Sequence, residues 1–271
     1  YTNGQVLPLG ETQLPAGVYT QMRLVLDGTP PPGSPPGTLA NAVKPTGGVE
    51  TALDTPSGMQ SGLKMNVNIE VPADKIADFA IDFHTCKSFV HAGSSGKVLL
   101  KPVLTVIPIL SEAGQRIVGW VDPALAASAT SVSAQASGVP VRATPPDASG
   151  KFVLYPVPAG NYDLVITAPG RVNAVMTGVP VVTTAFTTIG SATAPLIPPA
   201  ASTPAAAASG VVSANGSSND TGGEVRATQT FAGGPTVEVG YAAANAIGGA
   251  YAMTLPTAAA ARTAYAASAA G

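Results

Sequence analysis

Charged side chains are scarce in this sequence. Asp, Glu, Lys and Arg make up 10% of its 271 residues, against about 25% in an average soluble domain. The net charge of −2, with Lys and Arg scattered singly, leaves no positive field for phosphates, so we expect no nucleic-acid partner. Solubility must come from Ser, Thr, Asn, Gln and Gly, a composition common in secreted and surface-layer proteins. We therefore expect an extracytoplasmic location: the outer-membrane surface, the periplasm or the extracellular space.

Cysteine, histidine and long apolar runs are also nearly absent. Cys86 is the one cysteine, so the chain cannot form an internal disulfide, and we expect its thiol to be buried as a small hydrophobe. No apolar run approaches 18 residues, and no transmembrane segment is expected. The first residue is Tyr1 rather than Met, with no signal-like segment after it, so we expect a mature or truncated product.

What the sequence does contain is a series of short alternating segments that end in Gly, Pro, Asn or Asp. Alternation with a period of two indicates strands, and many short strands at about ten-residue spacing are typical of sandwiches or barrels. We found no convincing amphipathic helix. The fold class predicted is all-β, with tandem Ig-like or transthyretin-like β-sandwiches. The clearest strands are expected over residues 18–26, 63–71, 79–83, 98–107, 117–121, 131–136, 151–155, 162–167 and 179–184.

An approximate internal repeat and a Pro/Ala-rich stretch suggest the division into domains. Gly150, Phe152 and Leu154 follow one small-residue turn, as Gly249, Tyr251 and Met253 follow another. We predict a β-sandwich over residues 1–110, a second over 111–193, an extended Pro/Ala linker over 194–209 and a divergent repeat over 210–271.

Two stretches carry resemblances to known families. Residues 147–155 (DASGKFVLY) and 157–165 (VPAGNYDLV) resemble carboxypeptidase-regulatory-like, transthyretin-like domains, which implies a β-sandwich and no particular activity. Residues 14–26, 55–64, 80–86 and 99–108 resemble the bacterial envelope family known as domain of unknown function 4382. That resemblance implies an exported, often lipid-anchored β-sandwich. The family's amino-terminal strands are missing, so we expect the chain to begin inside this domain.

Two motifs resemble catalytic signatures without meeting their structural requirements. Ser61 and Lys64 match the S-x-x-K spacing of serine β-lactamases, which places Ser and Lys one helical turn apart. Here the following residues alternate as a strand, which would point the two side chains to opposite faces. The sequence GMQSG at 58–62 misses the nucleophile elbow by one position.

The candidate metal ligands form one cluster in the sequence. Asp82, His84 and Cys86 would share one strand face, and His91 follows, so a zinc site is conceivable. The simpler interpretation is a polar sheet edge, and the recurring carboxylates Asp74, Asp78 and Asp82 are expected on a solvated face. We predict no catalytic, cofactor-binding or metal-binding residues, and no cofactor.

The functional hypothesis is a non-enzymatic structural or interaction protein of the bacterial cell envelope, such as an adhesive, a spacer or an extracellular fibre subunit. Its partners would be envelope components or further copies of itself, joined into filaments by strand addition. The alternative is a module that binds glycans or another envelope component. Exposed aromatic side chains on one sheet face would favour it, although aromatic residues make up 5% of the chain.

Overall fold

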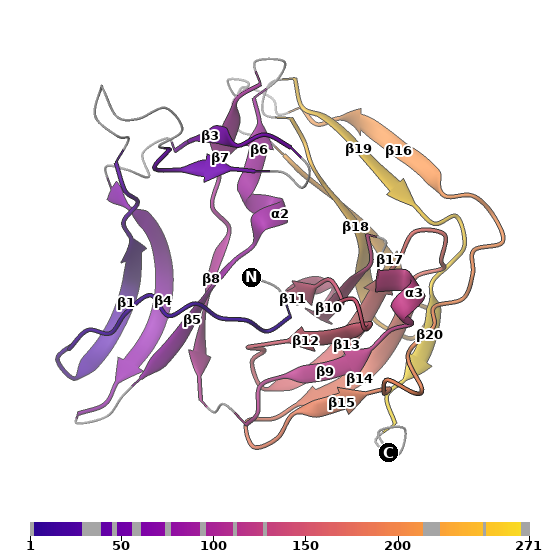
Figure 1. Cartoon of the computed structure of the whole chain (residues 1–271), viewed down its shortest axis with the longest axis horizontal. Helices are drawn as coiled ribbons and strands as arrows, with labels where there is room; N and C mark the ends of the chain where they lie inside the picture. The colour runs from indigo at the N-terminus through magenta and orange to yellow at the C-terminus, as the bar shows by residue number, and fades with distance from the viewer. Residues whose placement is uncertain are drawn as a thin grey trace.

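The computed structural model describes residues 3–28, 39–44, 48–55, 61–73, 77–92, 96–110, 113–126, 129–213, 223–245 and 248–266. Strands make up nearly all of their regular secondary structure, with two short helices, α2 (Thr85–Ser88) and α3 (Pro123–Ala126). The all-β prediction is therefore confirmed. Figure 1 shows three groups of strands around a common centre, which α2, β11 and β18 approach from different sides.

The middle of the chain forms a β-sandwich of a five-stranded and a three-stranded sheet. The larger sheet has the order β11-β10-β13-β14-β20 and the smaller one β12-β9-β15. Residues that alternate along the strands fill the space between them. Phe152, Leu154 and Ile117 come from the smaller sheet, and Val132 and Leu164 from the larger one, all at most 1% exposed. The strand bounds are β9 (Ile117–Trp120), β10 (Ser131–Ala136), β11 (Val139–Thr144), β12 (Lys151–Leu154), β13 (Gly160–Thr167), β14 (Ala174–Val181) and β15 (Thr187–Ile189).

The first part of the chain forms smaller sheets. Strand β1 pairs with β4, β5 with β8, and four short strands follow the order β2-β3-β7-β6. The single strand predicted over 98–107 is wrong: it is divided at Lys101–Val103. Pro102 has no N–H for a ladder, and the N–H groups of Lys101 and Val103 bond to Ser88 instead. The bounds are β1 (Gly17–Leu24), β2 (Ala42–Val43), β3 (Thr51–Asp54), β4 (Leu63–Val71), β5 (Asp78–Phe83), β6 (Phe89–His91), β7 (Val98–Leu100) and β8 (Leu104–Ile109).

Backbone hydrogen bonds join the last part of the chain to the middle sandwich. Its strand β20 extends the larger sheet of the sandwich, pairing parallel with β14 from Ala174↔Ala261 to Thr177↔Ala264. Residues predicted as linker also lie along the sandwich: the Leu196 N–H donates to Trp120 O at 2.8 Å, and the Ala201 N–H to Gly170 O at 3.0 Å. The bounds are β16 (Ala206–Val211), β17 (Glu224–Thr230), β18 (Thr236–Ala243), β19 (Ala250–Leu255) and β20 (Ala261–Ala264).

A short Pro-Ala-Gly-x-Tyr motif occurs at the start of two strands, β1 and β13. In each, the tyrosine hydroxyl donates to the carbonyl of the proline four residues earlier: Tyr19 to Pro15, and Tyr162 to Pro158, both at 2.8 Å. This closure resembles the tyrosine corner of Greek-key sandwiches, which fixes the turn that leads into a strand. The two turns therefore have the same local construction, although Tyr162 is buried and Tyr19 is half-buried.

Candidate functional site

Charged side chains from all three parts of the chain meet at its centre. Asp82 on β5 pairs with Arg142 on β11. Glu238 on β18 pairs with Arg226 on β17 and lies 4.0 Å from the Lys87 ammonium on α2. The contacts of Asp82 with Arg142 and of Lys87 with Glu238 link segments that are distant in sequence, so their geometry exists only in the folded chain. We call these five residues the junction cluster.

Glu238 is the most buried member of the junction cluster, with a side chain 8% exposed. A buried carboxylate is tolerated when cations and hydrogen bonds compensate its lost hydration. Arg226 supplies a positive charge and a hydrogen bond to the Glu238 carboxylate. The same guanidinium also donates to the Gly138 carbonyl on the middle sandwich. Lys87 lies 4.9 Å from the Tyr241 ring centroid, which adds a cation–π contact. Arg226 and Lys87 therefore contact a carboxylate, a carbonyl and an aromatic ring of the same chain.

At the same place, a side-chain amide bonds to the backbone of β18 as a neighbouring strand would. Gln135 on β10 is 1% exposed. Its Nε2 donates to the Glu238 carbonyl at 2.9 Å, and its Oε1 accepts from the Glu238 N–H at 2.7 Å. The amide therefore satisfies both backbone groups of a buried residue 103 positions away in sequence. This fixes β18 against the sandwich at a single register.

His84 lies at the edge of the junction cluster. Burial is the main cause that lowers the pKa of its imidazole, and the nearby Lys87 charge lowers it further, while Asp82 and Glu238 act in the opposite direction. The expected arrangement of Asp82, His84 and Cys86 on one strand face is wrong. Strand β5 ends at Phe83 and the chain turns into α2, where the Ser88 hydroxyl donates to the His84 carbonyl at 2.8 Å. The Cys86 side chain lies outside the described residues.

The lowered pKa of His84 predicts a pH dependence of stability. The imidazole of the unfolded chain takes up a proton near its ordinary pKa of 6.5, and that of the folded chain only at lower pH. Acidification through this range therefore favours unfolding, and the contribution of His84 is fully present above pH 6.5. We expect His84→Gln to flatten the fall in the free energy of unfolding between about pH 7.5 and 5.5, a range above most carboxyl titrations. Urea denaturation at intervals across it measures this, and equal slopes in both proteins would contradict the assignment.

The remaining sequence candidates do not assemble into a site. Asp78 is exposed at the start of β5, and Asp74 lies outside the described residues. Lys64 is exposed on β4 beside the buried Leu63, and Ser61 precedes the strand, so no helical turn brings Ser61 and Lys64 together. Among the described residues, no three His, Cys, Asp or Glu side chains are grouped to hold a metal ion. None of the described helices is long and apolar enough to cross a bilayer.

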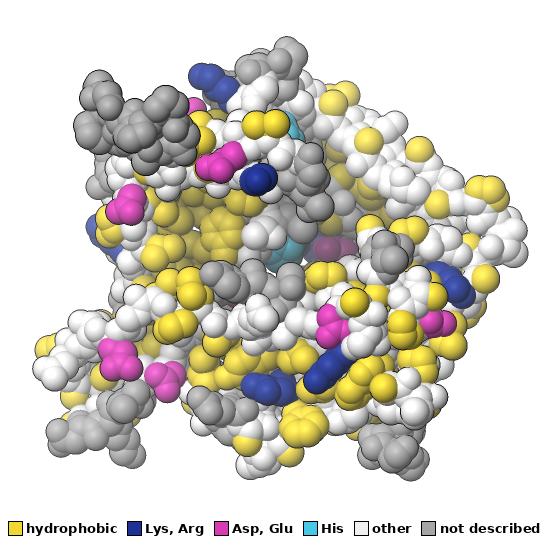
Figure 2. All heavy atoms as spheres, viewed as in Figure 1, with side chains coloured by type: hydrophobic (Ala, Val, Ile, Leu, Met, Phe, Trp, Pro, Cys, Tyr) yellow, Lys and Arg dark blue, Asp and Glu magenta, His cyan; other side chains and the backbone are white. Residues whose placement is uncertain are grey.

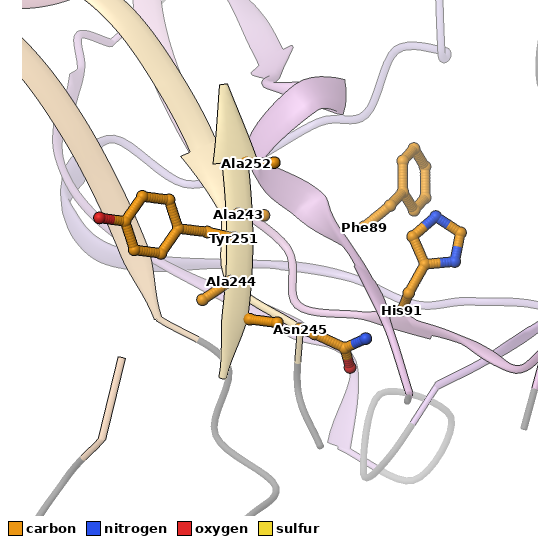
Figure 3. A pocket seen from close by; sticks show the side chains of 8 residues that line it. Phe89, His91, Ala243, Ala244, Asn245, Tyr251 and Ala252 are labelled. Carbon is orange, nitrogen blue, oxygen red and sulfur yellow. The ribbon is translucent and has the colours of Figure 1, made fainter. Parts of the chain in front are cut away.

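A cleft of about 330 Å³ opens near the junction cluster, between β6 of the first part and β18 and β19 of the last part. In Figure 3 the rings of Phe89 and His91 lie side by side on β6, and the Asn245 amide extends from the opposite side toward His91. The Tyr251 ring turns to the other face of β19, away from Phe89 and His91 (Figure 3). In Figure 2 the molecule is hollowed on one face, with hydrophobic side chains on a wall and a histidine and an acidic side chain deep inside. Sequence reasoning did not find the cleft, because its two walls are more than 150 residues apart.

Strand β16 forms an open edge of a two-stranded sheet. Within the part of the chain that the structure describes, it pairs with β19 alone, from Ala206↔Leu255 to Val211↔Ala250, without a shift in register. Side chains on one of its faces are exposed, and Val211 is 67% exposed. The strand contains neither charge nor proline.

Comparison with known proteins extends the description of the first part of the chain. A family model described as a domain of unknown function (DUF4382) matches residues 1–102, which confirms that resemblance. The resemblance of the middle sandwich to carboxypeptidase-regulatory-like domains stays a prediction. No curated protein matches the chain.

Two solved structures are similar to part of the chain. They are crystal structures of N-terminal and C-terminal interface mutants of a type II cohesin–X-dockerin complex from Acetivibrio cellulolyticus. Each is 18% identical, with TM-scores of 0.28 and 0.27, and the matches cover 32% and 31% of this chain. They span 59% and 56% of the chains matched, and no functional conclusion rests on a likeness of this extent.

Proposed function

We propose that the chain is a non-enzymatic structural or interaction protein of the bacterial cell envelope that joins its partners by strand addition. The observation that carries this is the open edge of β16. An edge strand offers a row of unpaired N–H and C=O groups, and proteins usually block it with charge, proline, a bulge or a covering segment. Strand β16 contains no charge, proline or bulge within its bounds.

Other edges of the molecule are blocked in the ways that β16 is not. Strand β1 carries Arg23 and a bulge after Tyr19. Strand β11 contains Pro140, Arg142 and a bulge in its pairing with β10. On β12 the Asn3 amide covers the edge, because its oxygen accepts from the Val153 N–H at 2.9 Å. The contrast favours β16 as the surface on which a further strand pairs.

The junction cluster also supports a structural role. Two of its contacts join different parts of the chain: Asp82 pairs with Arg142, and Lys87 lies 4.0 Å from Glu238. A rigid body with an open strand edge suits a subunit of a fibre, an adhesive or a spacer. The scarcity of charge on the chain fits an extracytoplasmic setting. So does the match of residues 1–102 to the domain of unknown function, a resemblance that implies export.

A charge placed on the open edge is expected to abolish association. Ser209 is exposed on β16, and Ser209→Lys would place an ammonium beside the pairing groups, as natural edges do. We expect sedimentation velocity to show concentration-dependent assembly of the unaltered protein and a monomer for Ser209→Lys. The matched control is Ser202→Lys, at an exposed position outside the strands, which should assemble normally. A monomeric unaltered protein, or assembly that Ser209→Lys leaves intact, would reject self-association by strand addition at β16.

The second candidate function is glycan binding, and the observation that favours it is the cleft beside β6. It brings an aromatic ring, an imidazole and an amide to one place between two parts of the chain. Binding sites are common at such boundaries, and volumes from about 300 Å³ are typical of small-ligand sites.

A further inference from the structure

The chemical character of the cleft limits what it can bind. Its eight lining residues include no Asp, Glu, Lys or Arg, so a charged ligand would find no counter-ion among them. The methyl groups of Ala243 and Ala252 point toward β6 in Figure 3 and give the cleft an apolar wall. His91 and Asn245 place polar groups at its rim. A ligand that suits this lining is neutral, with an apolar face and hydroxyl groups at its edge.

A pyranose ring has this combination of surfaces. The C–H groups on one face of the ring pack against aromatic and methyl groups, and the hydroxyls around it exchange hydrogen bonds with amides and imidazoles. The cleft volume of about 330 Å³ lies at the small end of the range for ligand sites. It therefore suits a single sugar ring rather than a long oligosaccharide.

The walls of the cleft are held in place before any ligand binds. The Phe89 ring lies 5.8 Å from that of Phe83, centroid to centroid. Strand β6 pairs with β7 from Phe89↔Leu100 to His91↔Val98. The contacts of Lys87 with Glu238 and Tyr241 hold α2, the element before β6, against β18. Preorganisation of this kind lowers the cost of ordering the site on binding.

We propose that this cleft binds the terminal neutral pyranose of a glycan. Phe89, Ala243 and Ala252 would pack against the ring, while His91 and Asn245 would bond to its hydroxyls. The proposal rests on the second candidate function and assigns it a site and a ligand class. It is independent of strand addition at β16.

The test uses the full chain and a panel of methyl glycosides of glucose, galactose, mannose and N-acetylglucosamine. Saturation-transfer-difference NMR detects binding, and titration gives the Kd, which we expect at about 1 mM for at least one sugar. Ala252→Trp would fill the cleft from an exposed position, and His91→Ala would remove a donor without touching the core. Each should weaken binding of that sugar at least about tenfold, or 1.4 kcal/mol.

The controls separate this proposal from the others. Ala259→Trp adds the same bulk at an exposed position away from the cleft and should leave the Kd unchanged. Ser209→Lys should bind sugar normally even if it no longer assembles. Absence of binding to every sugar overturns the glycan candidate together with its site. Binding of a sugar that neither Ala252→Trp nor His91→Ala weakens overturns the site alone.

Discussion

Glu238→Ala is expected to lower the free energy of unfolding by about 3–5 kcal/mol, the range for breaking a buried ion pair by removing one partner. The carboxylate is 8% exposed and pairs with Arg226 from β17, while Lys87 from α2 lies 4.0 Å away. Without it, both cations keep their desolvation penalty and lose their counter-charge. The substitution also removes the contact of Lys87 with Glu238, which joins the first part of the chain to the last. The loss should therefore exceed that of an ordinary surface substitution several-fold.

Equilibrium denaturation in urea measures this effect through the midpoint and the slope. The matched control is Glu224→Ala, which removes an exposed glutamate from the neighbouring strand β17 and should change stability by less than about 0.5 kcal/mol. If the two variants lose similar amounts of free energy of unfolding, the contacts of Glu238 in the junction cluster do not stabilise the protein more than an exposed glutamate does. A second transition in Glu238→Ala alone would show that the junction couples the parts of the chain into one unit.

Strand positions and core faces could be predicted from the sequence because alternation acts locally. The strands predicted over 63–71 and 131–136 agree with β4 and β10 at both ends. Phe152, Leu154, Tyr162 and Leu164 point into the core as the alternation indicates. Alternation with a period of two indicates which face of a strand is buried, and it can be recognised from the residues of that strand alone.

The partners of those strands could not be predicted in the same way. Alternation does not state which strand lies beside which, and the parallel pairing of β14 with β20 joins residues 87 positions apart at Ala174↔Ala261. The contact of Gln135 with Glu238 has no local signal either, because it forms between an amide and a backbone 103 residues away. The Pro-Ala-Gly-x-Tyr motif, in contrast, can be recognised in the sequence alone, because residues 15–19 and 158–162 are identical except for the fourth residue.

The turn into α2 shows how a local pattern can mislead. The alternation of Asp82, His84 and Cys86 predicts a continuing strand, yet the Lys87 N–H bonds to the His84 carbonyl at 3.0 Å and closes a helical turn. The Ser88 hydroxyl accepts from the Val103 N–H at 3.0 Å, a contact from outside the segment. Tertiary hydrogen bonds therefore override a weak strand preference, which is more context-dependent than helix preference.

Gly150→Ala is expected to destabilise the protein by about 4 kcal/mol, through backbone strain and overpacking together. Gly150 has φ +81°, in the left-handed region that disfavours residues with a Cβ. An added Cβ would also overlap the Val121 carbonyl oxygen. That oxygen cannot move freely, because the Val121 N–H donates to the Gly150 carbonyl at 2.9 Å, at the end of the pairing between β9 and β12.

Gly178→Ala separates these two causes. Gly178 has φ +74°, nearly the same backbone conformation, but an added Cβ there would meet no atom within 4 Å. This variant should lose only the strain of about 1–2 kcal/mol for a left-handed residue. The difference between the two variants in urea denaturation therefore measures the overlap with Val121. If Gly150→Ala and Gly178→Ala lose the same stability, the sandwich relaxes around the added methyl group, and close approach is not the reason for glycine at position 150.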